Sequence, residues 1–239
     1  MSADQVGLSV VVPVYDEVET LEPLVARVVA AIEPLEWIWE LILVDDGSTD
    51  GSAERMEELA ARHRQLRPVH LAGHCGQSAA LHAGFTSSRG TLVATLDADL
   101  QTSPEEIPRL VEELEARHVD AVVGIRVERS DSLWRRLSAR LANWVRNWLT
   151  SEDIVDTGCP LKVFRGEAIR SVRAFDGMHR FLPTLLKMDG RAVAQVPVRH
   201  AARMAGRSKY GTVDRALRGL HDALAVRWMQ RRALRWRLR

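Results

Sequence analysis

Residues 8–32 read LSVVVPVYDEVETLEPLVARVVAAI, and the two halves of this stretch carry two different hydrophobic patterns. Residues 8–14 form a nearly continuous apolar run, which is typical of a strand buried on both faces of a sheet. Residues 20–32 instead repeat apolar side chains at the three- and four-residue spacing of an amphipathic helix. A buried strand followed by a covering helix predicts an α/β fold.

The same alternation continues along the first half of the chain. We expect further strands at residues 39–44, 68–71, 91–96 and 119–124, and helices at 52–66, 77–87 and from 104 to about 117. This order predicts a mostly parallel sheet flanked by helices. Because such sheets bind ligands at the carboxyl ends of their strands, the polar residues that follow each strand are the candidate site.

The second half is richer in Arg and Trp. We expect helices at 133–149, from 166 and at 179–188, strands at 161–164 and 192–198, a basic loop at 199–211 and a helical tail at 213–239. We therefore divide the chain into one domain, residues 1–211, and a basic amphipathic C-terminal helical extension, residues 212–239.

Charge is distributed unevenly between the two halves. Residues 1–125 hold 8 basic and 22 acidic side chains, a net −14, whereas residues 126–239 hold 25 and 10, a net +15. This split predicts an acidic half that can hold a metal ion and a basic half that faces an anionic partner. Of the 33 basic residues 30 are Arg, which suits bidentate phosphate binding, although genome base composition accounts for that choice equally well.

Composition also narrows the class of protein. With 46% hydrophobic and 27% charged residues, the chain is neither a disordered tail nor a collagen nor a disulfide miniprotein. Its two cysteines make no disulfide framework, which favours an intracellular protein. No apolar run reaches the roughly 20 residues of a membrane span, and no signal peptide is evident. These features predict a cytoplasmic protein.

Acidic side chains follow three of the expected strands. The sequence DADLQ at 97–101 places two carboxylates two residues apart and adds an amide, and such oxygen ligands suit a hard divalent cation. The sequence DDGS at 45–48 follows another strand, and PVYDE at 13–17 follows the first. Each alone is also compatible with an ordinary turn or helix start.

Taken together, these blocks resemble the inverting GT-A glycosyltransferases of family 2. VVPVYDE (11–17), LVDDGSTDGS (43–52) and LDADLQ (96–101) match blocks found across that family. GIR (124–126), DTGCPLKVFR (156–165) and the HRFLP to GRSKYG stretch (179–211) are similar to the polyprenyl-phosphate sugar transferases, the branch that includes dolichol-phosphate mannose synthase. The resemblance covers roughly residues 7–225.

The resemblance implies an enzyme that moves a sugar from a nucleotide-diphosphate sugar to a polyprenyl phosphate, with inversion. It implies that the base and ribose are held by Pro13, Tyr15, Glu17, Val44 and Asp46. It further implies that Mg²⁺ or Mn²⁺ and the diphosphate are held at Asp97, Ala98, Asp99 and Gln101, where the metal would stabilise the leaving diphosphate. Basic residues that contact phosphates in this branch match Arg126, Arg203 and Lys209.

The role of Asp156 is left open at this stage. It matches an acidic position proposed as a general base in related enzymes, and we count it with Asp99, Arg126 and Arg203 as a candidate catalytic residue. A lipid-phosphate acceptor is already anionic near pH 7 and needs no base, so Asp156 would then position a neighbouring group; a hydroxyl acceptor would need a base. The chain also departs here from the Ser-Gly-Phe-Arg block of the mannose synthases.

Five of the seven Trp lie in the two Arg-rich segments 133–149 and 213–239, and Trp with Arg on amphipathic helices suits an anionic membrane surface. Core packing is the alternative. We therefore expect peripheral association with the cytoplasmic membrane face, directly or through an anchoring partner, and no nucleic-acid partner.

Two alternatives remain for the function. One is a family 2 transferase that acts on a saccharide or protein hydroxyl, and the other is a non-catalytic nucleotide-binding protein at the membrane surface. A nicotinamide dehydrogenase is disfavoured because no G-x-G-x-x-G follows the first strand.

Overall fold

The structure is a computed structural model that describes residues 5–35, 37–127, 147, 149–150, 152–199 and 212–233, the last range with side chains from residue 219 onward. Its strands are β1 (Leu8–Val14), β2 (Trp39–Asp45), β3 (Leu66–His70), β4 (Leu92–Thr95), β5 (Ala121–Val127), β6 (Lys162–Arg165) and β7 (Val193–Arg199). Its α-helices are α1 (Val18–Ile32), α2 (Ser52–Arg62), α3 (Gln77–Ser87), α4 (Ile107–Ala116), α6 (Gly166–Arg170), α7 (Leu182–Met188) and α8 (Thr212–Arg232). Short 3₁₀ turns are η1 (Glu33–Leu35), η2 (Pro104–Glu106) and η3 (Met178–Arg180).

The described strands form one seven-stranded sheet in the order β3-β2-β1-β4-β6-β5-β7. Only β6 runs antiparallel to its neighbours β4 and β5, and the other pairs are parallel. Six strands therefore end at the same edge of the sheet, while β6 begins there. The predicted mostly parallel sheet is confirmed.

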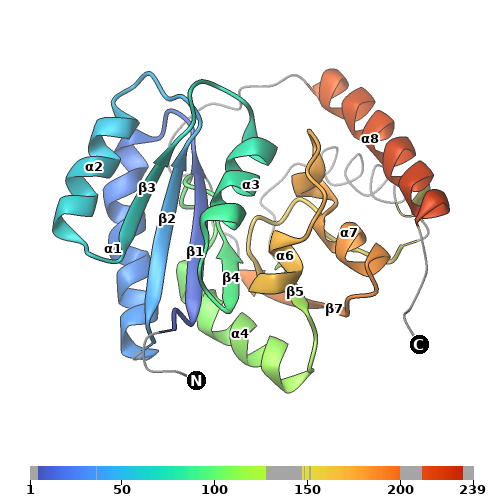
Figure 1. The fold of residues 1–239 in the computed structure, drawn as a ribbon, viewed down its shortest axis with the longest axis horizontal. Coiled ribbons are helices and arrows are strands. Elements are labelled where there is room, and N and C mark those ends of the chain that lie inside the picture. Colours follow the sequence, from blue (N-terminus) through green and yellow to red (C-terminus); the bar gives the residue numbers. More distant parts are fainter. Residues whose placement is uncertain are drawn as a thin grey trace.

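Helices cover both faces of this sheet (Figure 1). One face packs against α1, α2 and α4, and the other packs against α3, α6, α7 and α8. Within β1, Val10 and Val12 belong to the first core cluster and Val11 belongs to the second, all at 0% exposure. This two-sided burial explains why the strand sequence is continuously apolar instead of alternating.

Some predicted helix boundaries were wrong. The helix expected at 52–66 ends at Arg62, because His63 is already extended and β3 begins at Leu66. The helices expected to start at 104 and 179 begin as the 3₁₀ turns η2 and η3. In the second case Pro183 lies in the first turn of α7, where its missing N–H is harmless, so a new helix starts after η3.

The helix α8 packs closely on the domain. Its Ala223 and Val226 are buried at 1% and 0% exposure in the second core cluster. Gln230 Nε2 donates to the carbonyl of Thr150 at 2.8 Å. Among the described helices, none has the length and hydropathy that crossing a bilayer requires. The predicted helix 133–149 falls outside the described residues except at 147 and 149, as do residues 234–239 of the predicted tail.

Candidate active site

The acidic turn after β2 is built around Asp46, which is 2% exposed. Its Oδ1 accepts hydrogen bonds from the backbone amides of Cys75 at 2.7 Å and Gly76 at 3.1 Å. Its Oδ2 accepts from the Gly76 amide at 2.9 Å and lies 2.9 Å from His74 Nδ1. The carboxylate therefore fastens the loop between β3 and α3 to the carboxyl edge of the sheet.

An aromatic pair lies beside this carboxylate. The rings of Tyr15 and His74 stack with centroids 4.1 Å apart and planes 26° from parallel. The close approach of the two loops requires Gly47, whose φ is +74° and where a Cβ would lie 2.6 Å from backbone atoms of Gly73. Stacked rings next to a buried acceptor form a surface that suits a planar, hydrogen-bonding group.

The turn after β1 is tied to the turn after β2 by side chains. The amide of Glu17 donates to Ser52 Oγ at 2.9 Å, and the amide of Val18 donates to Asp50 Oδ2 at 3.0 Å. Partial burial opposes ionisation of Asp50, but hydrogen bonds from Ser52 and from backbone amides outweigh it and lower the pKa of this carboxyl. The ends of β1 and β2 therefore form one connected wall.

The turn after β4 carries the two carboxylates of the DADLQ block. Asp97 Oδ1 accepts from Gln77 Nε2 at 3.0 Å, and Asp99 Oδ1 accepts from the Gln101 amide at 3.1 Å. Leu100 adopts φ +59°, so the chain turns sharply between Asp99 and Gln101. Within the described residues, no group of three or more His, Cys, Asp or Glu side chains could hold a metal ion.

This donor set nevertheless fits a hard divalent cation. Mg²⁺ and similar ions are commonly bound through one or two carboxylates, with phosphate oxygens of a substrate and water completing the coordination. The carboxylates of Asp97 and Asp99 and the side-chain amide oxygen of Gln101 lie on one turn. They meet that requirement without forming an all-protein cage. The site would therefore bind metal together with a phosphorylated ligand.

A largely buried ion pair lies at the end of β5. Arg126 binds Asp156 in a bidentate arrangement, with Nε to Oδ2 at 2.7 Å and Nη2 to Oδ1 at 2.8 Å. The amides of Arg126 and Gly158 also donate to this carboxylate, each at 3.2 Å. Burial would lower the pKa of Arg126, but the hydrogen bonds and charge of Asp156 outweigh it and raise it. The guanidinium is therefore held charged and oriented.

Two buried groups lie beneath this pair. Cys159 is fully buried, and its removal from water raises the pKa of the thiol to about 11. Lys162 is 4% exposed, and burial lowers the pKa of its ammonium group. Lys162 Nζ donates to the carbonyl oxygen of Cys159.

The structure gathers most of the predicted site residues at the carboxyl edge of the sheet. They are Pro13, Tyr15, Glu17, Val44, Asp46, Asp97, Ala98, Asp99, Gln101, Arg126 and Asp156. Arg203 and Lys209 lie outside the described residues. Sequence reasoning missed His74, Gln77 and Lys162, although the Gly-containing stretch before α3 was a signal that backbone approaches closely there.

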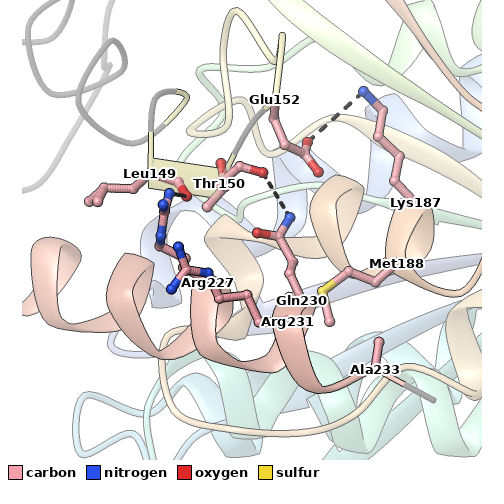
Figure 2. Close-up of a pocket in the computed structure, with 9 residues that line it drawn as sticks. All are labelled: Leu149, Thr150, Glu152, Lys187, Met188, Arg227, Gln230, Arg231 and Ala233. Atoms are coloured by element: carbon pink, nitrogen blue, oxygen red, sulfur yellow. Dashed lines mark hydrogen bonds and ion pairs between the residues drawn. The ribbon is translucent and has the colours of Figure 1, made fainter.

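A pocket of about 410 Å³ lies elsewhere, between α7, α8 and residues 149, 150 and 152 (Figure 2). Its lining includes Lys187, Arg227 and Arg231, with Glu152 as the acidic member. None of the predicted site residues that the structure describes lines it. Arg227 donates to the carbonyl of Leu149 at 2.5 Å, so part of this charge holds α8 in place.

Solved structures with the same sheet and helix layers define the class of fold. The mannosyl-3-phosphoglycerate synthase from Rubrobacter xylanophilus superposes with a TM-score of 0.69 at 20% identity, covering 98% of this chain and 77% of that one. A Mycobacterium tuberculosis glucosyl-3-phosphoglycerate synthase in complex with Mn²⁺ and uridine-diphosphate-glucose has a TM-score of 0.67 at 22% identity, covering 92% and 78%. The predicted GT-A fold is confirmed.

The chain belongs to glycosyl transferase family 2, whose sequence profile matches residues 9–173. It is 40% identical to the dodecaprenyl-phosphate galacturonate synthase of Rhizobium johnstonii, over 94% of this chain and 67% of that one. It is 44% identical to the undecaprenyl-phosphate 4-deoxy-4-formamido-L-arabinose transferase of Pseudomonas aeruginosa, over 86% and 61%. The chain thus spans about two thirds of the length of these relatives.

Proposed function

We propose that this glycosyltransferase moves a sugar from a nucleotide-diphosphate sugar to a polyprenyl phosphate. The observation that carries the proposal is its 40–44% identity to relatives named for dodecaprenyl-phosphate and undecaprenyl-phosphate sugar transfer, over 85–94% of its length. The carboxyl edge of the sheet also supports the proposal. The ends of β1 and β2 suit a nucleotide, and the end of β5 holds the oriented guanidinium of Arg126.

The nucleotide would lie over the ends of β1 and β2. The base would pack against Tyr15 beside Pro13, with the fully buried Val44 supporting this wall from within the core, and Asp46 would accept hydrogen bonds from the base or ribose. Glu17 would face the ribose, as the family resemblance implies. Since Asp46 already orders the loop that carries His74, nucleotide binding would use a surface that is formed before the ligand arrives.

The diphosphate would bind at the turn after β4. Asp97, Asp99 and Gln101 would hold a Mg²⁺ or Mn²⁺ ion, which when bound neutralises charge on the leaving diphosphate. Gln77 would orient Asp97 through its 3.0 Å hydrogen bond. Charge stabilisation matters here because sugar transfer passes through an oxocarbenium-like state in which the leaving group gains negative charge.

The acceptor phosphate would bind Arg126. Asp156 engages two of the five guanidinium N–H groups and thereby fixes the plane in which the others are offered to a phosphate. An acceptor phosphate oxygen is already anionic near neutral pH, so the attack on the sugar carbon needs no base. Asp156 is therefore proposed as a positioning residue, and Arg203 and Lys209 as further phosphate contacts.

This assignment also bears on the alternative of a hydroxyl acceptor. That reaction would need a general base within about 3 Å of the hydroxyl. Both carboxylate oxygens of Asp156 are already engaged by the guanidinium of Arg126 at 2.7 and 2.8 Å, and the backbone amides of Arg126 and Gly158 also donate to them. The geometry therefore favours the phosphate acceptor.

A membrane surface is the second part of the proposal. The described outer side of α8 exposes Leu220, Leu224 and Trp228 at four-residue spacing, at 43%, 50% and 63% exposure. Arg231 and Arg232 follow them and are exposed. We propose that residues 1–211 form the catalytic domain and that the extension 212–239 docks it on the anionic cytoplasmic face of a membrane.

The function is tested by incubating the protein and Mn²⁺ with a panel of nucleotide sugars and short, water-soluble polyprenyl phosphates. The proposal predicts a sugar-phosphate-prenyl product with inverted anomeric configuration, and the variant D99N in parallel should form little. Transfer to saccharide or peptide hydroxyls alone would support the first alternative. Nucleotide binding without turnover would support the non-catalytic alternative.

A further inference from the structure

Lys162 is a buried cation at the centre of the carboxyl edge. It is the first residue of β6, the strand that lies between β4 and β5, and it pairs in register with Thr95 and Val123. Its 4% exposure means that the ammonium group has been removed from water almost completely. Asp97 and Asp156 supply the acidic charges around it, and Arg126 supplies a repelling one.

The residues between Asp156 and Lys162 form a loop, here called the 156–161 loop, which carries the carboxylate that orients Arg126. Three consecutive carbonyls of this loop are held by buried donors from three neighbouring strands. The donors are Lys162 Nζ to Cys159 O, Thr95 Oγ1 to Pro160 O at 2.6 Å, and the Gly124 amide to Leu161 O at 3.0 Å.

Stability alone does not account for an amine at this position. Burying an ammonium group is unfavourable, and replacing a whole buried ion pair with well-packed apolar side chains is often neutral or stabilising, so a buried charge is weak evidence of a stabilising role. A methionine would fill nearly the same volume without the desolvation penalty. What the amine adds is a donor directed at the 156–161 loop and a positive charge shared between Asp97 and Asp156.

We propose that Lys162 is a positioning residue that fixes the 156–161 loop, so that Asp156 presents Arg126 to the acceptor phosphate. The inference rests on the proposed function, because it takes Arg126 as the acceptor-phosphate contact. Lys162 would then affect use of the acceptor phosphate. The wall at the ends of β1 and β2, where the nucleotide would bind, does not include Lys162.

The main test is the variant K162M, assayed with a nucleotide sugar and a short polyprenyl phosphate. The kcat/KM for the acceptor should fall about 10–100-fold, a loss like that caused by removing the outer-shell partner of a metal ligand. Nucleotide affinity, measured by calorimetry without a divalent cation so that the metal site at Asp97 does not contribute, should stay unchanged. Because K162M leaves the Cys159 carbonyl without its buried donor, the melting temperature should fall. The variant K162R, which keeps a cationic donor, should recover part of the acceptor kcat/KM.

Two further variants separate positioning from packing. T95V removes the donor to Pro160 with almost no change in shape, and it should weaken acceptor use in the same direction as K162M. V163A shortens the fully buried neighbour on β6 and should lower the melting temperature through a cavity, while the kinetic constants stay unchanged. Hydrogen–deuterium exchange of the 156–161 loop should quicken in K162M and T95V but not in V163A.

A K162M enzyme with wild-type acceptor kcat/KM, or one that loses nucleotide affinity as much as acceptor use, would overturn the inference. If the wild type transfers no sugar to a prenyl phosphate, the proposed function fails. In that event the exchange measurement still tests whether Lys162 fixes the loop, and unchanged exchange in K162M would overturn that claim as well.

Discussion

Replacing Asp46 with Asn keeps the shape of the side chain but removes its charge and one acceptor oxygen. In D46N the side-chain amide oxygen can still accept from the Cys75 backbone amide. The new NH₂ group would face the Gly76 amide and His74 Nδ1, each of which lies 2.9 Å from Asp46 Oδ2 in the wild type. Hydrogen bonds to a charged group contribute about 1.5–3 kcal/mol, and at 3% side-chain exposure water offers little compensation. Loss of the proposed hydrogen bond from the base or ribose to this charged carboxylate should lower nucleotide affinity about 10- to 150-fold.

The assay is calorimetric titration of the nucleoside diphosphate with Mn²⁺ present, and D120N is the matched control. Asp120 accepts from the Ala192 amide at 2.8 Å and from Arg191 at 3.1 Å, but it lies at the amino end of β5, on the opposite edge of the sheet. Both variants should unfold at lower temperature than the wild type. Only D46N should bind nucleotide more weakly.

Wild-type nucleotide affinity in D46N, accompanied by a stability loss like that of D120N, would refute this reasoning. Asp46 would then be an anchor for the turn after β2 and nothing more. Weakened nucleotide binding in D120N would instead show that the loss in D46N comes from general destabilisation.

The remaining predictions concern metal, membrane and acid stability. D99N should lose most turnover while melting like the wild type, and excess chelator should abolish wild-type activity; full activity in chelator would contradict the metal site. The double variant R231Q/R232Q should bind anionic vesicles about 30-fold more weakly, at about 1 kcal/mol per charge, but keep its turnover of a soluble acceptor. Co-sedimentation at two salt concentrations checks this, and W228A should act in the same direction. Glu40 is 1% exposed, and although burial raises its pKa, hydrogen bonds from Ser9, Arg89 and Arg67 outweigh this and lower it. The contribution of this carboxylate to stability is complete above the unfolded pKa of 4.5 and is lost as pH falls through the lower folded pKa. E40Q should therefore be less stable than the wild type by about 1–3 kcal/mol at pH 7 and equally stable in strong acid. Denaturant titration at each pH measures both differences.

Local sequence pattern predicted some elements to the residue. The strand β1 and the helix α3 begin and end at the predicted residues, because β1 is a continuous apolar run followed by polar residues and α3 is bounded by Gly76 and Ser88. The direction of β6 could not be predicted in this way. A run of four residues, LKVF, fits either direction, and only its pairing with β4 and β5 determines that it runs antiparallel.

The candidate site also contains residues that the sequence could predict and residues that it could not. Asp46, Asp97 and Asp99 could be predicted because strand ends and carboxylates are visible in the sequence. His74 could not, because its meeting with Asp46 depends on the backbone approach of Gly47 and Gly73, which hydrophobic pattern does not encode. Lys162 was missed for a related reason, since a charged residue at the start of a strand normally indicates an exposed position.

The pairing of β4 has a consequence for how the chain folds during synthesis. One edge of β4 pairs with β1, but the other pairs only with β6, where Thr95 meets Lys162, 67 residues further along the chain. At ribosomal speeds of about 5–20 residues per second, that edge would stay open for about 3–13 s after β4 emerges. Its sequence, LVAT, carries no charged residue or Pro that would blunt the edge, and an uncovered apolar edge can recruit a foreign strand. The reversed strand that brings Lys162 to the carboxyl edge therefore also ends the interval in which the nascent sheet is prone to aggregate.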